Sequence, residues 1–242
     1  MSLAEGTGAA LEVADVTVRY GGVVALDGVG LRITRGTVVG LIGPNGAGKT
    51  TLINAIAGIV PLASGTIALG ARRLEGLSQH RRARAGIART YQNVRLFARL
   101  TVGENVRAGA YARPATLDDA RTRTLLERTG MTETELERPA GTLSYGEQRR
   151  LEIARALAAE PAILLLDEPA AGMNPHETKA LRDVIASVAR SGIGVLLVEH
   201  DMSLVAAACD RVVVLDFGKK IAEGTPQDVA SHPAVVSAYL GS

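Results

Sequence analysis

At 242 residues, the chain is long enough to bury a sizeable core, either as one domain or as a core with a small subdomain. Hydrophobic residues make up 47% and charged residues 21% of the chain, which is ordinary for a soluble globular protein. The net charge of +2 is too small to indicate a polyanionic partner. Aromatic residues make up only 3% of the chain, too few to predict the stacking surface that binds single-stranded nucleic acid. Both observations argue against a nucleic-acid partner.

The cysteine content and the apolar runs indicate the compartment of the protein. The single cysteine, Cys209, excludes an intramolecular disulfide, and its apolar neighbours predict a small buried side chain. Residues 1–10 lack the basic stretch and apolar run of a secretory signal, and no apolar run approaches the roughly 18 residues that span a bilayer. We expect a cytosolic protein whose membrane contact comes through a partner.

Short apolar runs without polar alternation predict a parallel sheet, because strands covered on both faces need no polar side. The runs are 38–42, 163–166, 195–198 and 212–215. Residues 11–20 and 67–69 instead resemble half-covered strands of a smaller sheet. Residues 218–220 predict a hairpin turn.

The stretch from about 94 to 160 has a helical pattern and no strand-like run. We interpret it as a helical subdomain inserted into an α/β core of roughly 11–93 and 161–242. Pro114 and Pro139 are expected to divide it into separate helices.

Residues 43–50, the phosphate loop, match the pattern G-x-x-x-x-G-K-[ST] between an apolar run and a helical run at 51–57. Glycines let the backbone curl so that its N–H groups point at phosphates, and the following helix contributes the positive end of its dipole. Lys49 is expected to reach the β- and γ-phosphates, and the Thr50 hydroxyl to bind Mg²⁺. The pattern alone does not separate kinases, GTPases and transport ATPases. The candidate ATP contacts here are Gly43, Asn45, Gly46, Gly48, Lys49, Thr50 and Thr51.

Two acids, Asp167 and Glu168, end the apolar run at 163–166. Ligands of open α/β folds bind at the carboxyl edge of the sheet, so Asp167 is a candidate Mg²⁺ ligand. Glu168 projects differently and suits the orientation or deprotonation of an attacking water. A solvated strand end is the plain alternative, although adjacent acids on a buried strand need a cation or hydrogen bonds to compensate them.

The signature segment, residues 143–148, precedes a strong helical run at 149–159. Ser144 and Glu147 have the spacing of a capping box, which is compatible with a helix start alone. The segment also resembles the LSGGQ signature of ATP-binding cassette (ABC) ATPases, with Tyr145 in place of the first glycine. The resemblance implies that Ser144 and Gly146 approach the γ-phosphate of ATP bound to the opposite subunit of a head-to-tail dimer.

Further motifs of this family follow in the expected order, and the resemblance covers residues 11–240. It implies that Tyr20 stacks on adenine, that Gln92 of the Q-loop (89–93) senses Mg²⁺ and the membrane partner, and that His200 contacts the γ-phosphate. The D-loop (170–174) ends in Asn174 where aspartate is usual. The implied fold is an ABC ATPase fold in a single domain, 1–242, with a P-loop core, an antiparallel β subdomain and the helical insertion. The implied catalytic residues are Lys49, Glu168 and His200, and the implied metal ligands are Thr50, Gln92 and Asp167.

Four segments, 92–97, 145–154, 168–175 and 197–202, resemble one branch of the family, the ATPases of branched-chain amino acid importers. Residues 221–226 and 238–241 agree with it. This branch implies transmembrane permease subunits, a second ABC ATPase that is identical or different, and a periplasmic or extracellular substrate-binding protein. The chain would then lie on the cytoplasmic face of the cell membrane, held there by the permease.

The sequence is also compatible with other functions. Lipopolysaccharide export and urea import use ATPases that resemble this branch, and some soluble ABC proteins act on ribosomes or DNA. Ribosome-acting members usually carry two cassettes in one chain and DNA-repair members long coiled coils, whereas this chain has one cassette and no sustained heptads.

The stretch 72–99 holds eight arginines and one acid, Glu75. It predicts either a solvated face with scattered counterions or a surface that faces the membrane partner and anionic headgroups.

Overall fold

The computed structural model describes residues 11–92, 94–112, 117–132 and 135–240. The predictions about residues 1–10, Asn93, Pro114 and Gly241 therefore fall outside the described residues. Within the described ranges, no helix combines the length and the apolar character that a membrane crossing requires.

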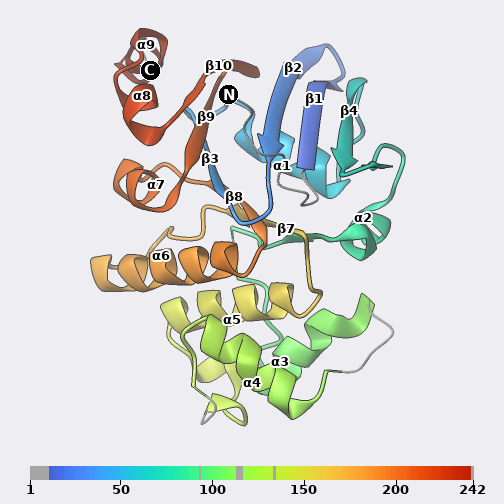
Figure 1. Cartoon of the computed structure of the whole chain (residues 1–242), viewed down its shortest axis with the longest axis vertical. Helices are drawn as coiled ribbons and strands as arrows, with labels where there is room; N and C mark the ends of the chain where they lie inside the picture. Colours follow the sequence, from blue (N-terminus) through green and yellow to red (C-terminus); the bar gives the residue numbers. More distant parts are fainter. Residues whose placement is uncertain (1–10, 93, 113–116, 133–134, 241–242) are drawn as a thin grey trace, which may run out of the picture.

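A six-stranded sheet in the order β10-β9-β3-β8-β7-β6 forms the centre of the molecule (Figure 1). The ladders from β9 to β6 are parallel, and β10 pairs antiparallel with β9. All four apolar runs form strands of this sheet, so the predicted parallel sheet is confirmed. The strands are β3 (Val38–Ile42), β6 (Ile87–Arg89), β7 (Ile163–Asp167), β8 (Gly194–Val198), β9 (Arg211–Asp216) and β10 (Lys219–Gly224).

Both faces of the parallel strands are buried, as the runs predicted. On β3, Val38 and Ile42 belong to the hydrophobic cluster that includes the large helices, whereas Val39 and Leu41 belong to the cluster of the smaller sheet. β7 and β8 alternate in the same way. Each face thus has its own core, and polar residues are confined to the strand ends.

The smaller sheet is antiparallel, in the order β2-β1-β4-β5. Its strands are β1 (Leu11–Tyr20), β2 (Val23–Ile33), β4 (Ser64–Leu69) and β5 (Arg72–Arg73). The predictions for 11–20 and 67–69 are confirmed, whereas β2, β5 and β6 were not predicted. β2 pairs with β1 through several register shifts, so its sequence lacks a clean alternation.

The helices are distributed over three regions (Figure 1). α1 lies on the side of the smaller sheet, α6 lies on the opposite face of the parallel sheet, and α3, α4 and α5 form a layer beyond α6. The described part of residues 94–160 is helical, with one isolated bridge and no strand, as predicted. The helices are α1 (Lys49–Ala57), α2 (Gln79–Ala85), α3 (Val102–Gly109), η1 (Ala110–Ala112), α4 (Asp119–Arg128), η3 (Ala140–Thr142), α5 (Tyr145–Leu157), α6 (Pro175–Arg190), α7 (Met202–Ala208), α8 (Pro226–Ala230) and α9 (Pro233–Leu240).

Several boundaries differ from the prediction. α1 and α5 begin earlier than the predicted runs at 51 and 149, since the phosphate loop and the signature segment both run directly into their helices. The hairpin predicted at 218–220 is confirmed by the antiparallel pairing of β9 and β10, but its turn lies at Phe217 and Gly218, and both lysines belong to β10. Cys209 is buried as expected, and burial raises the pKa of its thiol to about 12.

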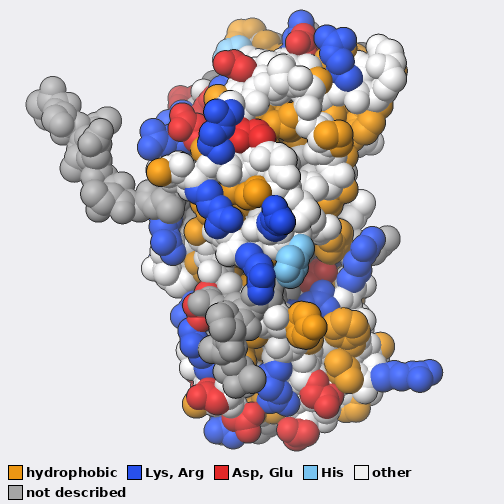
Figure 2. Space-filling view, turned by 90° about the vertical axis from the view of Figure 1, so that its right-hand side faces the viewer, with side chains coloured by type: hydrophobic (Ala, Val, Ile, Leu, Met, Phe, Trp, Pro, Cys, Tyr) orange, Lys and Arg blue, Asp and Glu red, His pale blue; other side chains and the backbone are white. Residues whose placement is uncertain are grey.

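The arginine-rich stretch does not form one surface. Figure 2 shows Lys and Arg side chains gathered at mid-height on the side of the molecule that carries β4 and α2. Arg72, Arg73, Arg81 and Arg84 are exposed, but Arg82 is only 3% exposed. The surface interpretation is therefore wrong for Arg82.

Arg82 holds the C-terminal end of α1. Its Nη1 donates to the carbonyls of Ala55 at 2.6 Å and Ile56 at 2.9 Å, and its Nε donates to the Leu77 carbonyl at 3.2 Å. Carbonyls in the last turn of a helix have no partner within the helix. The buried guanidinium supplies partners for two of them.

We expect Arg82→Ala to lower the free energy of unfolding by about 3 kcal/mol, because buried carbonyls lose a charged donor. Arg81→Ala, an exposed neighbour on the same helix, should change it by less than about 0.5 kcal/mol. Urea unfolding followed by circular dichroism measures both variants. Equal effects at the two positions would contradict the role given to Arg82.

Candidate nucleotide site

The phosphate loop lies between β3 and α1 and is constrained by contacts that a side chain would disrupt. A Cβ on Gly43 would collide with the Leu215 carbonyl. Gly48 has φ 102° and lies so close to β2 that a Cβ would come within 2.9 Å of the Ala25 carbonyl. Both positions therefore need glycine, because neighbouring carbonyls approach closely and because φ is positive at both, 148° at Gly43 and 102° at Gly48.

Lys49 connects the start of α1 to the beginning of the loop. Its Nζ donates to the carbonyls of Gly43 at 2.6 Å and Pro44 at 2.9 Å, and the residue is only 8% exposed. Burial lowers the pKa of Lys49, while the nearby Glu168 and Asp167 act in the opposite direction. The Lys49 ammonium thus lies beside the loop. A phosphate oxygen can replace the two carbonyls as the acceptor of its hydrogen bonds.

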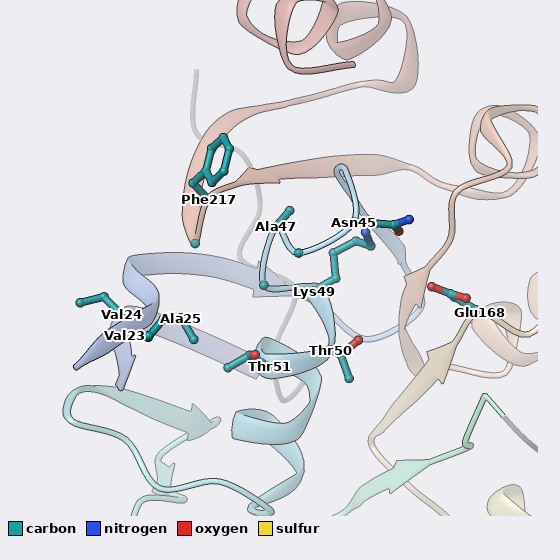
Figure 3. A pocket seen from close by; sticks show the side chains of 13 residues that line it. Val23, Val24, Ala25, Asn45, Ala47, Lys49, Thr50, Thr51, Glu168 and Phe217 are labelled. Carbon is teal, nitrogen blue, oxygen red and sulfur yellow. The ribbon is translucent and has the colours of Figure 1, made fainter. Parts of the chain in front are cut away.

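A pocket of about 460 Å³ opens above the loop. Figure 3 shows Glu168 across the pocket from Lys49, with Thr50 and Thr51 at the start of α1. Seven predicted residues line it: Asn45, Gly46, Gly48, Lys49, Thr50, Thr51 and Glu168. Ala47 of the phosphate loop also lines it, and Val23, Val24, Ala25, Phe217 and Gly218 complete the lining; none of these six was among the predicted contacts.

Gly43 and Tyr20 were also predicted as ATP contacts, but neither belongs to the described lining of this pocket. Tyr20 ends β1, pairs with Val23 of β2 and is 49% exposed. Phe217 does line the pocket; it is 87% exposed and has a positive φ of 41°. The turn that carries it is fixed by Gly218, whose N–H donates to the Ala47 carbonyl at 3.0 Å.

Asp167 at the end of β7 is compensated by a protein cation. Its Oδ2 accepts from Arg89 Nη2 at 2.9 Å, and both side chains are 8% exposed. Arg89 Nη1 also donates to the Asn54 side chain at 2.5 Å. Arg89 therefore supplies the positive charge that a buried acid requires. Arg89 was not predicted to belong to the site, because Asp167 is far from it in the chain.

Glu168 follows β7 with a positive φ of 44°. Its N–H donates to the Val198 carbonyl at 3.0 Å, and its Oε2 accepts from the Gln92 side chain at 2.9 Å. The Gln92 side chain therefore contacts Glu168 directly. Both predicted residues meet at the edge of the pocket, from segments that are distant in sequence.

His200 follows β8, and its side chain is 67% exposed. The neighbouring Glu199 is buried and accepts from the N–H of Ala170 at 2.9 Å and of His200 at 3.2 Å. Burial raises the pKa of Glu199. Glu199 thereby connects the segment of His200 to the D-loop. It was not among the site residues predicted from the sequence.

Asn174 closes the D-loop as the N-cap of α6. Its side chain accepts from Glu177 N–H at 3.0 Å, and Glu177 accepts from Asn174 N–H at 3.0 Å. Asparagine and aspartate are equally good N-cap residues. Asparagine in place of the usual aspartate therefore still caps the start of α6.

The signature segment begins α5 in the helical layer (Figure 1). Ser144 is the N-cap, and a complete capping box joins it to Glu147, so the structural role foreseen for this spacing is confirmed. Gly146 faces Glu177 so closely that a Cβ would come within 2.7 Å of its carboxylate. Neither Ser144 nor Gly146 belongs to the described lining of the pocket in the same chain.

Comparison with known proteins agrees with these motifs. The family model described as ABC transporter matches residues 26–171, and the model of the branched-chain amino acid ATP-binding cassette transporter matches residues 219–242. The chain is similar to the high-affinity branched-chain amino acid transport ATP-binding protein BraF of Pseudomonas aeruginosa, with 44% identity over 96% of this chain and 97% of that protein. LivG of Escherichia coli K12 follows with 43% identity over 96% and 97%.

More distant similarities agree with the family. The lipopolysaccharide export system ATP-binding protein LptB of Escherichia coli K12 is 37% identical over 96% of this chain and 98% of its own length. The crystal structure of the ADP conformation of an ATP-binding cassette of an ABC transporter superposes with a TM-score of 0.87 and 29% identity, covering 98% of this chain and all of that one. The predicted fold and family are confirmed.

Proposed function

Because the chain belongs to the ABC transporter family and carries its ATPase domain, we propose that it hydrolyses MgATP to power import of branched-chain amino acids. The observation that supports the substrate class best is the pair of relatives with more than 40% identity over nearly the whole chain, both named for this transport. The match of residues 219–242 to a branched-chain amino acid transporter model supports it independently.

The residues at the pocket fit a magnesium nucleotide. Mg²⁺ prefers oxygen ligands and keeps several waters, so few protein ligands are needed once phosphates are bound. Thr50 and Asp167 offer such oxygens, and Gln92 is close enough to Glu168 to take part. The described residues contain no cluster of three acids, histidines or cysteines, which fits a metal held mainly by phosphates and water. When bound, the ion would neutralise charge on the phosphates.

In the proposed reaction, backbone N–H groups of the phosphate loop and Lys49 hold the phosphates. Glu168 orients or deprotonates the attacking water, and His200 contacts the γ-phosphate. Tyr20 supplies the adenine contact. Ser144 and Gly146 complete the ATP site of a second ABC ATPase in a head-to-tail dimer, which fits their place outside the pocket of their own chain.

The proposed assembly has permease subunits in the membrane, two ATPase subunits on the cytoplasmic face and a substrate-binding protein outside. Closure of the dimer around ATP would be driven by the higher affinity of ATP for the closed state. Hydrolysis would remove the γ-phosphate bridge and let the dimer reopen.

Capture of the tagged chain from membranes, followed by mass spectrometry, tests the assignment. We expect a multi-spanning permease pair, a second ATPase and an amino-acid binding protein. Uptake of leucine by cells that express the chain, compared with cells that express Glu168→Gln, checks the substrate. A lipid-export partner, the alternative that the 37% identity to LptB suggests, or ribosomes without a membrane protein, would overturn the import assignment while keeping the ATPase.

A further inference from the structure

Arg149 on α5 is a buried cation that connects two functional segments. Its side chain is fully buried. Nη1 donates to the Tyr91 carbonyl at 2.6 Å, and Nη2 donates to the Gln92 carbonyl at 2.6 Å. The guanidinium therefore holds two successive backbone carbonyls of the Q-loop, one on each side of the Gln92 Cα.

The second pair of Arg149 contacts lies on its own helix. Nη1 donates to Glu152 Oε2 at 2.8 Å, and Nη2 donates to the Tyr145 hydroxyl at 3.0 Å. All four hydrogens on the two terminal nitrogens are thus directed at oxygen acceptors. Glu152 is itself buried, and its other oxygen accepts from the N–H groups of Tyr91 at 3.5 Å and Arg95 at 3.4 Å. Burial raises the pKa of Glu152 despite its pairing with Arg149.

Tyr145 gives this cluster its link to the signature segment, since it is the first residue of α5 and stands next to Ser144. Its ring also lies near the D-loop, since a Cβ built on Gly172 would be 3.8 Å from Tyr145 Cε1. At the other end, the Gln92 side chain donates to Glu168 at 2.9 Å. A continuous series of contacts therefore runs from Tyr145 through Arg149 and Gln92 to Glu168.

We propose that Tyr145 and Arg149 are positioning residues that couple the signature segment of each chain to the Glu168 of the same chain. The inference rests on the proposed function, in which the signature segment serves the ATP of the partner subunit while Glu168 serves the ATP of its own. A shift of α5 when the partner's γ-phosphate binds moves Arg149 with it, because both lie on one helix. Arg149 then moves the Gln92 backbone, and the Gln92 side chain changes the position of Glu168.

The geometry accounts for tyrosine in place of the first signature glycine. A glycine at position 145 would offer no hydroxyl to Arg149 and no ring to the D-loop. The phenol is four residues before Arg149 on the same helix, the spacing at which helical side chains meet. The planar fork of arginine can serve two carbonyls, a carboxylate and a hydroxyl at once, which the compact ammonium of lysine cannot.

Steady-state ATPase kinetics of Tyr145→Phe test the coupling, because this change removes the hydroxyl and keeps the ring near the D-loop. We expect kcat to fall about fivefold, with the KM for ATP changed by less than about twofold, since the phosphate loop is untouched. Tyr111→Phe is the matched control, because Tyr111 lies in the helical layer and is 92% exposed; it should leave both constants unchanged. Equal kcat values for Tyr145→Phe and Tyr111→Phe would overturn the proposal.

A double-mutant cycle with Gln92→Ala separates coupling from a merely structural role. Removal of the Gln92 side chain cuts the series of contacts before Glu168, so Tyr145→Phe should then lower kcat by less than about 1.5-fold further. Additive losses in kcat would show that Tyr145 acts independently of Gln92 and would refute the inference alone. A wild-type chain without ATPase activity would overturn the proposed function, and the inference with it.

Discussion

Glu168→Gln is expected to bind ATP as the wild-type chain does and to hydrolyse it more slowly by at least about tenfold, and on the order of a hundredfold if Glu168 is the general base. The amide keeps the shape of the side chain and still has an oxygen that accepts from Gln92. It can no longer take a proton from water. The loss should therefore fall on kcat while the affinity for ATP is retained.

Two measurements check this result: phosphate release under saturating MgATP, and equilibrium binding of a fluorescent ATP analogue. Glu127→Gln is the matched control, since Glu127 is an exposed glutamate on α4, in the helical layer. It should leave both values unchanged. Near-normal turnover by Glu168→Gln would remove Glu168 from the role proposed here.

Four strands of the large sheet, β3, β7, β8 and β9, could be predicted because strands buried on both faces have uninterrupted apolar runs. β3, β7 and β8 each follow this rule residue by residue. β2 escaped prediction because Asp27, Gly28 and Gly30 interrupt its pattern, and the register shifts against β1 let the strand tolerate them. β6 has only three residues, too few for any period to emerge.

The phosphate loop was predictable for a different reason: a contiguous segment makes it, so its pattern is complete in the sequence. Contacts between distant segments had no such signal. Arg89 pairs with Asp167 across 78 residues, and nothing near Arg89 distinguishes it from the exposed arginines of the same stretch. The link between Gln92 and Glu168, across 76 residues, likewise depends on the order of the strands in the sheet.

Only some of the contacts of Arg149 could be predicted from the sequence. Its spacing from Tyr145 and Glu152 is visible in the sequence and matches neighbours on one face of a helix. That spacing alone is typical of exposed side-chain pairs on a helix. Its contacts with the carbonyls of Tyr91 and Gln92, and hence its burial, follow only from the packing of α5 against the Q-loop.

Lys49→Ala is expected to weaken ATP binding by roughly tenfold to a hundredfold, the loss that follows from removing a charge-assisted contact to phosphate. Hydrolysis at subsaturating ATP should fall at least in proportion. Because Lys49 Nζ donates to the carbonyls of Gly43 and Pro44, the change also removes two contacts that hold the loop together without nucleotide. Equilibrium binding of ATP and of adenosine distinguishes these two consequences.

If the ammonium acts on the phosphates, ATP affinity should fall while the much weaker affinity for adenosine stays the same, since adenosine has no phosphate to lose. If the loop collapses, both affinities should fall and the thermal midpoint should drop with them. Lys179→Ala, an exposed lysine on α6, is the control and should match the wild type in all three measurements. Unchanged ATP affinity and rate in Lys49→Ala would contradict the proposed position of the phosphates, because Lys49 lines the pocket of Figure 3 next to the phosphate loop.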